Sequence, residues 1–201
     1  MNVKISPPKA LVFVAASLPI VYLAVAAVFD NLGSNPAEAL IRSTGDWALR
    51  FLCIALAVTP VRIVTARPAL ARFRRMLGLY CFFYGFVHAL CYAGLDMGLN
   101  MADIARDIGK RPFILVGFFA FCILLLLAAT SWNGAQRYLG GRRWQALHRG
   151  VYLVAPLAIT HFLWMRAGKN NFAEVWWYAA VLGGLLGFRL RQFMAKRGSG
   201  P

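Results

Sequence analysis

The chain has 201 residues, of which 60% are hydrophobic and only 14% are charged, and its mean hydropathy is +0.61. This composition excludes an ordinary soluble domain and indicates a protein that lies in a lipid bilayer. The net charge of +15 would suggest nucleic acid as the partner of a soluble protein, but here the basic residues lie in short stretches between apolar runs, as topology determinants do, so no nucleic-acid partner is expected.

Apolar runs in the first two thirds of the chain predict four transmembrane helices. Ala10–Phe29 is an uncharged run. As a helix with a rise of about 1.5 Å per residue it would be about 30 Å long, which is the thickness of the hydrocarbon core. Trp47–Val64 follows, with its two arginines near its ends, where they can reach the interface. Met76–Leu95 and Pro112–Trp132 are again free of Asp, Glu, Lys and Arg. All four runs are long enough to span a membrane.

Two further runs complete the prediction. Trp144–Met165 contains Arg149 near its start and Pro156 in its middle, and Phe172–Arg189 is shorter. We find no linker or repeat that would divide the chain. The sequence therefore predicts an all-α integral membrane protein, a six-transmembrane-helix bundle that forms one domain over residues 1–201.

The distribution of basic residues predicts the orientation. Fourteen of the 22 Lys and Arg residues lie at the two termini and around the loops after the second and fourth spans, against six on the opposite side. Membrane proteins keep an excess of basic residues on the cytoplasmic side. Both termini are therefore expected to be cytoplasmic.

The chain has three histidines, His88, His148 and His161, and each lies in or at the edge of an apolar run. The third and fifth spans run in the same direction through the bilayer. His88 lies 13 residues beyond Arg75, and His161 lies 13 residues beyond His148, so each is about 20 Å deeper than its reference residue. Because His88 and His161 share a level, they can supply both axial ligands of a haem iron between helices 3 and 5.

His148 lies near the cytoplasmic edge, where a second haem would need a further histidine near Arg75, and the sequence has none there. His148 could serve alone, beside an unusual ligand or with a different cofactor, and one haem shared among all three histidines in alternative arrangements is also open. Arg74, Arg75 and Arg149 could hold haem propionates or a flavin phosphate at this level. For any one of them, a solvated topology charge is the commoner role.

Three segments carry a resemblance to a known family. They are VTPVR at the end of the second span, RRMLGLYCFFYGFVHALCYAGLDMG across the third and WQALHRGVYLVAPLAITHFLW across the fifth. In order and spacing they resemble the MsrQ (YedZ) family, the haem-binding membrane subunits of the periplasmic methionine sulfoxide reductase system, and the likeness covers essentially the whole chain. More distantly the chain is similar to the ferric reductase-like transmembrane domain, whose larger members carry four histidines in two pairs on the third and fifth helices.

The resemblance implies a function that composition and spacing do not establish. It implies a multi-pass protein of the bacterial inner membrane that holds haem b, with His88, His148 and His161 as the haem-associated histidines, and that also binds FMN. Electrons would enter from the quinone pool or a cytosolic flavin reductase and leave to a periplasmic molybdopterin catalytic subunit that repairs oxidised methionines. Sulfoxide reduction itself is then expected on the partner subunit, with no catalytic residue on this chain.

Two other functions fit a small helical membrane protein with intramembrane histidines. One is a cofactor-free transporter or proton relay that uses the histidines, although such relays usually also need carboxylates within the membrane. The other is an assembly or anchoring subunit whose histidines only form hydrogen bonds between helices.

Overall fold

The computed structural model describes residues 6–167 and 172–198, and most of these residues are helical. Within these ranges the chain forms α-helices with the following bounds: α1 Pro7–Val28, α2 Pro36–Val64, α3 Arg74–Cys91, α4 Met101–Lys110, α5 Pro112–Ala129, α6 Asn133–Leu139, α7 Gly141–His148, α8 Val151–Ala167 and α9 Ala173–Gly198. A short 3₁₀ helix, Pro68–Phe73, precedes α3, and a π-helical turn, Tyr92–Asp96, follows it.

Five stretches of the described chain are long and apolar enough to cross a membrane. They are Pro7–Val28, Pro36–Val64, Pro68–Asp96, Pro112–Ala129 and Gly141–Ala167. Each contains most of one of the first five apolar runs found in the sequence. The sixth run forms most of α9, which is helical but is not among the five, so a sixth membrane span stays a prediction.

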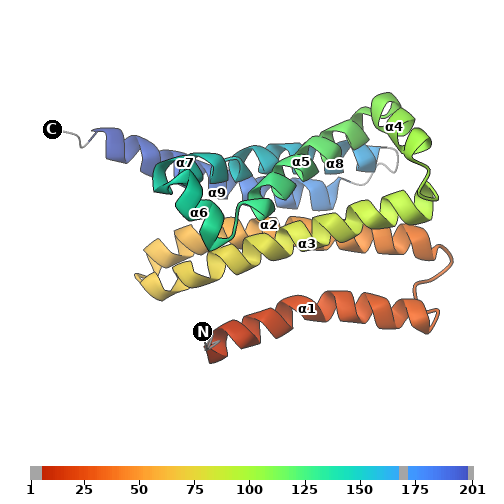
Figure 1. The fold of residues 1–201 in the computed structure, drawn as a ribbon, viewed down its shortest axis with the longest axis horizontal. Helices are drawn as coiled ribbons and strands as arrows, with labels where there is room; N and C mark the ends of the chain where they lie inside the picture. The colour runs from red at the N-terminus through yellow and green to blue at the C-terminus, as the bar shows by residue number, and fades with distance from the viewer. Residues whose placement is uncertain (1–5, 168–171, 199–201) are drawn as a thin grey trace.

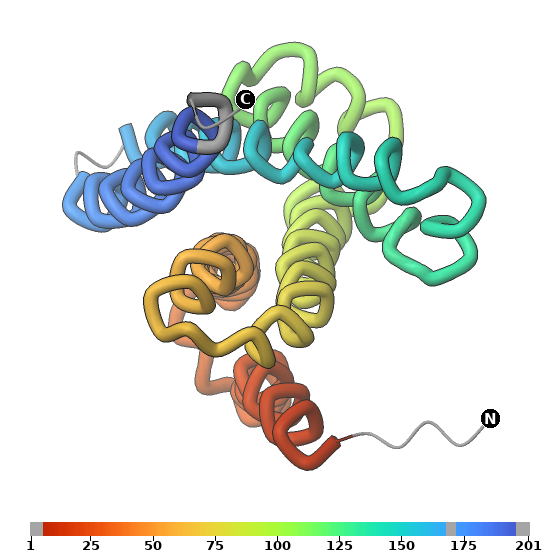
Figure 2. The backbone as a smooth tube through the Cα atoms, turned by 90° about the vertical axis from the view of Figure 1, so that its left-hand side faces the viewer, coloured from red at the N-terminus to blue at the C-terminus, as the bar shows by residue number. Residues whose placement is uncertain are grey.

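The long helices run roughly along one common direction (Figure 1). The view along the bundle shows α2 and α3 side by side, with α5, α8 and α9 on one side of them and α1 on the other (Figure 2). The two most extensive contacts are between antiparallel neighbours: α2 lies against α3, and α5 lies against α8. The space between these two pairs is where the histidines of α3 and α8 meet.

Apolar side chains fill the interior and also cover the outer surface. Phe51 of α2 stacks on Tyr80 and Tyr84 of α3, with ring centroids 5.4 and 5.2 Å apart. On α1, by contrast, large apolar side chains such as Leu11 and Tyr22 are about 70% exposed. Apolar surface of this extent is costly in water and is expected of helices that face lipid.

Two tyrosines of α3 attach α1 to the rest of the bundle. Pro19 lies inside α1 and has no N–H to continue the helical hydrogen-bond ladder. Beside it the hydroxyl of Tyr84 donates to the carbonyl of Ala16 at 2.8 Å and accepts from the N–H of Ile20 at 3.2 Å, so it lies between two groups that pair with each other in an undisturbed helix. One turn away, Tyr80 donates to the carbonyl of Phe13 at 2.9 Å.

Two expected boundaries differ from those observed. Helix α2 begins at Pro36, well before Trp47, because the Asn35 side chain caps it by accepting the N–H of Glu38 at 3.1 Å and proline is favoured at the first helical position. Polar residues therefore extend this helix beyond its apolar part.

The fifth predicted span, Trp144–Met165, consists of two helices, α7 and α8, rather than one continuous helix. The break lies at Arg149 and Gly150, where backbone N–H groups bond to carbonyls three residues back, as from Gly150 to Leu147 at 2.9 Å. His148 and His161 thus belong to different helices.

Candidate cofactor site

The side chains of His88, from α3, and His161, from α8, meet inside the bundle. Their ring centroids are 6.2 Å apart, and the ring planes are inclined by 79°. The two residues lie 73 positions apart in the sequence, so only the packing of the helices brings them together. The common depth expected from residue spacing is therefore realised as a direct approach of the two rings.

Each of these rings is oriented by a backbone carbonyl of a neighbouring helix. The Nδ1 atom of His88 lies 2.8 Å from the carbonyl oxygen of Ile41 in α2, and Nδ1 of His161 lies 2.7 Å from that of Phe113 in α5. A carbonyl only accepts, so in both rings Nδ1 carries the proton and donates it. Nε2 is then the nitrogen whose lone pair is left for a ligand in each ring.

Both histidines line one cavity of about 510 Å³, which we call the histidine-pair cavity. Its walls come from α2, α3, α5 and α8, and most of the side chains on them are apolar, among them Leu49, Ala120 and Phe162. Ligand pockets in proteins commonly enclose about 300–1,000 Å³ and combine apolar walls with a few directed polar groups. The cavity thus has the size and lining of a cofactor pocket.

The donor set fits a haem better than a bare metal ion. The described residues contain no group of three or more His, Cys, Asp or Glu side chains that could hold a metal. A haem iron already has four equatorial ligands and needs only two axial ones from the protein. Two imidazoles bonded through Nε2 at about 2 Å each would have their ring centroids about 6 Å apart, which agrees with the observed separation of 6.2 Å.

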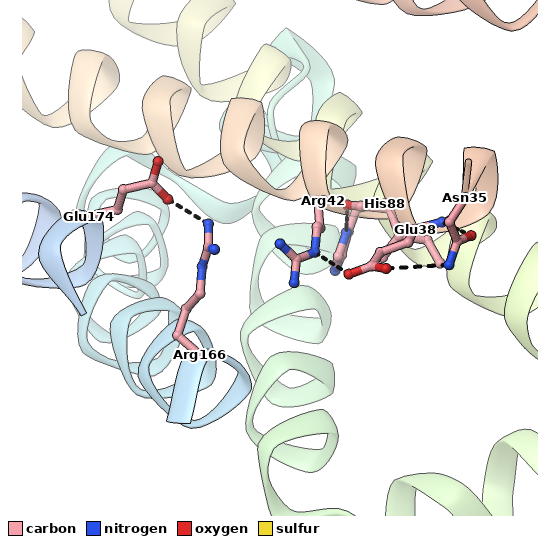
Figure 3. Close-up of polar contacts among 7 residues, drawn as sticks. Asn35, Glu38, Arg42, His88, Arg166 and Glu174 are labelled. Atoms are coloured by element: carbon pink, nitrogen blue, oxygen red, sulfur yellow. Dashed lines mark hydrogen bonds and ion pairs between the residues drawn. The ribbon is translucent and has the colours of Figure 1, made fainter. Parts of the chain in front are cut away.

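Charged residues line one end of the histidine-pair cavity. Arg42 forms an ion pair with Glu38 at 2.8 Å, and both side chains contribute to the lining together with Asp46 and Arg111. Figure 3 shows the Arg42–Glu38 pair near His88, and also the ion pair between Arg166 and Glu174. Arg42 and Arg111 are thus two cations that line this cavity. The sequence did not predict them as cofactor contacts, because each looks like an ordinary interfacial arginine near the end of an apolar run.

Arg111 also belongs to a polar network at the end of α4. Its guanidinium pairs with the Asp107 carboxylate, to which the Tyr92 hydroxyl donates at 2.6 Å. The hydrogen bond from Arg111 is the main reason why the pKa of Asp107 is lowered from its usual 3.8; desolvation acts in the opposite direction, and the bond from Tyr92 lowers the pKa further. The network holds the π-helical turn and α4 against the start of α5.

Replacing Asp107 by asparagine is expected to weaken this network at neutral pH and to have a smaller effect in acid. A carboxylate with a lowered folded-state pKa stabilises the fold above its unfolded-state pKa, and this contribution is lost as the pH falls through the lower, folded-state value. Unfolding midpoints of wild type and Asp107→Asn should therefore converge below pH 3.8. Asp103→Asn is the control, because the Asp103–Arg106 pair is exposed. A difference that grows on acidification would contradict the assignment.

The third histidine lies at a second cavity, of about 450 Å³, which we call the arginine cavity. It is lined by His148 and by all three arginines selected from the sequence, Arg74, Arg75 and Arg149. His148 stacks on Trp144 with ring centroids 4.0 Å apart, and its Nε2 lies 3.2 Å from the Thr130 hydroxyl. None of these four residues lines the histidine-pair cavity, so the structure separates them from His88 and His161.

The two cavities are neighbours. Both cavities are lined by Leu52, Cys81 and Leu124, so these three side chains lie between the two spaces. Cys81 is buried and is not part of any disulfide. The arrangement gives two adjacent compartments along the bundle, one with a pair of imidazoles and one with an imidazole and three guanidinium groups.

Comparisons with known proteins agree with a helical membrane protein. Residues 44–159 match the family described as ferric reductase like transmembrane component. The chain is 60% identical to the protein-methionine-sulfoxide reductase heme-binding subunit MsrQ of Polaromonas naphthalenivorans (strain CJ2), over 94% of this chain and 86% of that protein. It is 52% identical to the protein of the same name from Ralstonia nicotianae, over 92% of this chain and 88% of the relative. No solved structure matches the chain.

These matches cover most of the chain and include the helices that carry His88 and the start of the segment that carries His161. Together with five helices able to cross a membrane, they establish a multi-pass membrane protein with a role in electron transfer. The chain belongs to the MsrQ family of ferric reductase-like transmembrane proteins.

Proposed function

We propose that this chain is the haem-bearing electron-transfer subunit of a methionine sulfoxide reductase system, with His88 and His161 as the axial ligands of a b-type haem. The observation that carries the proposal is the pair of imidazoles, 6.2 Å apart, each with Nδ1 on a carbonyl and both in one apolar cavity. The names of the relatives, which are called heme-binding subunits, support it.

Bound there, the haem would supply reversible one-electron chemistry at its iron. The protein would determine how readily the iron is reduced. The hydrogen bonds from His88 and His161 to backbone carbonyls make both imidazoles better electron donors, and the apolar lining keeps water from the site. At the charged end of the cavity, Arg42 and Arg111 would bind the propionates.

The arginine cavity is the proposed entry point for electrons. Arg74, Arg75 and Arg149 provide cations for the phosphate of FMN or for haem propionates, and His148 is a second or alternative ligand. Arg189 of α9 adds to this charge: its Nε and Nη2 are buried without a hydrogen-bond partner among the described residues, and its guanidinium lies 5.8 Å from the centre of the Tyr152 ring, which lines the cavity. Buried guanidinium nitrogens without a hydrogen-bond partner favour an anionic ligand.

The proposed setting follows from the family and the charge distribution. The chain would cross the bacterial inner membrane six times with both termini in the cytoplasm, α9 being the sixth span, and the haem would lie between the third and fifth spans. Electrons would come from the quinone pool or a cytosolic flavin reductase and pass to a periplasmic molybdopterin subunit that reduces methionine sulfoxide. The name of the relatives supports the link to sulfoxide reduction.

The proposal is tested by purifying the protein and measuring its absorption spectrum and haem content, with each histidine replaced singly. We expect the sharp bands of a low-spin b-type haem in the reduced wild type, and their loss when His88 or His161 is replaced. A wild-type protein without haem after expression with adequate haem supply would refute the proposal. Proton flux in haem-free liposomes would then support the relay function.

Replacing His148 by alanine is expected to leave the low-spin haem of the histidine pair in place. His148 lies on the other cavity, and its Nε2 is already close to the Thr130 hydroxyl. The variant should instead weaken flavin or haem retention at the arginine cavity, which cofactor extraction and quantitation would measure. Loss of the bis-histidine spectrum in His148→Ala, with His161→Ala unaffected, would reverse the assignment of the ligands.

A further inference from the structure

The two histidines of the pair are held by the same local arrangement on two different helices. In α2 the carbonyl of Ile41 accepts from His88, and the residue four positions later is Gly45. In α5 the carbonyl of Phe113 accepts from His161, and the residue four positions later is Gly117. In an α-helix a carbonyl lies beside the residue four positions on, whose side chain would cover it.

Both glycines are in contact with the imidazole that bonds to the exposed carbonyl. A Cβ built on Gly45 would lie 3.1 Å from Nδ1 and Cε1 of His88. One built on Gly117 would lie 2.7 Å from Nδ1 of His161 and 2.9 Å from its Cε1. Real Cβ atoms essentially never lie closer than 3.0 Å to another heavy atom, so at Gly117 the ring would have to move.

Neither ring can move without losing its hydrogen bond. The bonds to Ile41 and Phe113, at 2.8 and 2.7 Å, fix Nδ1 at the position that the new Cβ would approach. Glycine is also unfavourable inside a helix, and both positions are well inside α2 and α5. The absence of a side chain at these two positions therefore has a specific use, which is to open one carbonyl to one imidazole.

The two arrangements differ in one respect. The hydroxyl of Thr44, which is fully buried, donates to the carbonyls of Leu40 and Ile41 at 2.7 and 3.0 Å, so the Ile41 carbonyl has an additional donor. No bond of this kind is present at Phe113, where position 116 is valine. A Cβ at Gly45 would also be less crowded by His88, at 3.1 Å, than a Cβ at Gly117 would be by His161, at 2.7 Å.

We propose that Gly45 and Gly117 are positioning residues for the two haem ligands, each acting by leaving open the carbonyl that fixes the tautomer and the angle of the imidazole. The inference rests on the proposed function, because it treats His88 and His161 as haem ligands. It adds that the electron-donating strength of each ligand is controlled from α2 and α5, helices that carry no ligand themselves.

The proposal predicts graded effects of Gly→Ala substitutions on the purified haem protein. Gly117→Ala should weaken haem binding on the order of tenfold, as expected when the hydrogen bond of a ligating histidine is lost, and Gly45→Ala should have a smaller effect. In the fraction that keeps haem, the reduction potential should become more positive, because a weaker hydrogen bond makes the imidazole a poorer donor and favours the ferrous state. The low-spin ferric EPR signal should change, and the reduced Gly117→Ala protein should bind carbon monoxide.

Gly183→Ala in α9 is the matched control, since a Cβ there would meet no described atom within 4 Å. It should keep the wild-type potential, EPR signal and resistance to carbon monoxide. If Gly117→Ala does not accumulate in the membrane, Gly45→Ala decides, because a contact of 3.1 Å requires a shift of only a few tenths of an ångström. Wild-type values of potential and EPR signal in Gly45→Ala and Gly117→Ala would overturn the proposal, whereas a wild type without haem would refute the proposed function instead.

Discussion

Replacing His161 by alanine is expected to abolish six-coordinate haem in the histidine-pair cavity. The variant removes one Nε2 atom that would bind the haem iron. It also removes the imidazole whose Nδ1–H donates to the carbonyl of Phe113. Loss of a ligand should reduce haem affinity by more than the roughly 10–100-fold that follows loss of a hydrogen bond to a ligating histidine. Haem quantitation and the reduced-minus-oxidised spectrum measure this directly.

Added imidazole separates the loss of a ligand from the loss of the fold. The His161→Ala variant has an opening the size of the missing ring, so imidazole in the buffer should enter it and restore part of the six-coordinate spectrum. His148→Ala is the control, because its ring lies on the arginine cavity. If His161→Ala retains the full wild-type haem content and spectrum without imidazole, His161 is not a ligand and the electron-transfer proposal loses its basis.

The depth of the two histidines could be predicted because helical rise is regular. Equal spacing from Arg75 and from His148 implied one level for His88 and His161, and the rings lie 6.2 Å apart in the structure. The two rings meet even though α7 and α8 are separate helices. The role of the two residues as haem ligands remains a prediction.

The residues around the pair could not be predicted in the same way. Gly45 and Gly117 lie 43 and 44 positions before the histidines that they contact, on helices with no ligand of their own. Gly117 appears in the sequence only as a glycine inside an apolar run, which is common in membrane helices and usually indicates close helix packing. Gly45 lies just before the second apolar run, beside Asp46, where glycine gives no sign of a ligand contact. A carbonyl as hydrogen-bond partner leaves no trace in the sequence at all, since every residue has one.

The charged residues that line the two cavities could be predicted only in part. Arg74, Arg75 and Arg149 were selected together from their position at the cytoplasmic edge, and the structure gathers them with His148 around one cavity. Asp46 lies outside the apolar run that starts at Trp47, yet it lines the histidine-pair cavity because α2 begins at Pro36 and brings it into the helix. Helix starts depend on capping by residues outside the apolar run, so hydropathy alone misplaces them.

Replacing Tyr84 by alanine is expected to destabilise the bundle by about 3–5 kcal/mol, the range for removal of a buried aromatic side chain. The Tyr84 side chain is fully buried, stacks on Phe51 and joins α1 to α3 through its hydroxyl. Unfolding of the purified protein by denaturant in mixed micelles, followed by circular dichroism, would measure the loss. Tyr84→Phe retains the ring and should cost about 1 kcal/mol, which isolates the contribution of the hydroxyl.

The effect of Tyr84→Phe should be concentrated in α1. The hydroxyl donates to the Ala16 carbonyl and accepts from the Ile20 N–H, next to Pro19. The bond from Tyr80 to Phe13 is one of few other polar links between α1 and α3 among the described residues. Hydrogen exchange should therefore rise around Ala16 and Ile20 and stay unchanged in α5 and α8. Tyr22→Phe is the matched control, because Tyr22 is about 70% exposed on the same helix. If Tyr84→Phe and Tyr22→Phe exchange alike, the hydroxyl does not hold α1, and the attachment of this helix must come from apolar packing alone.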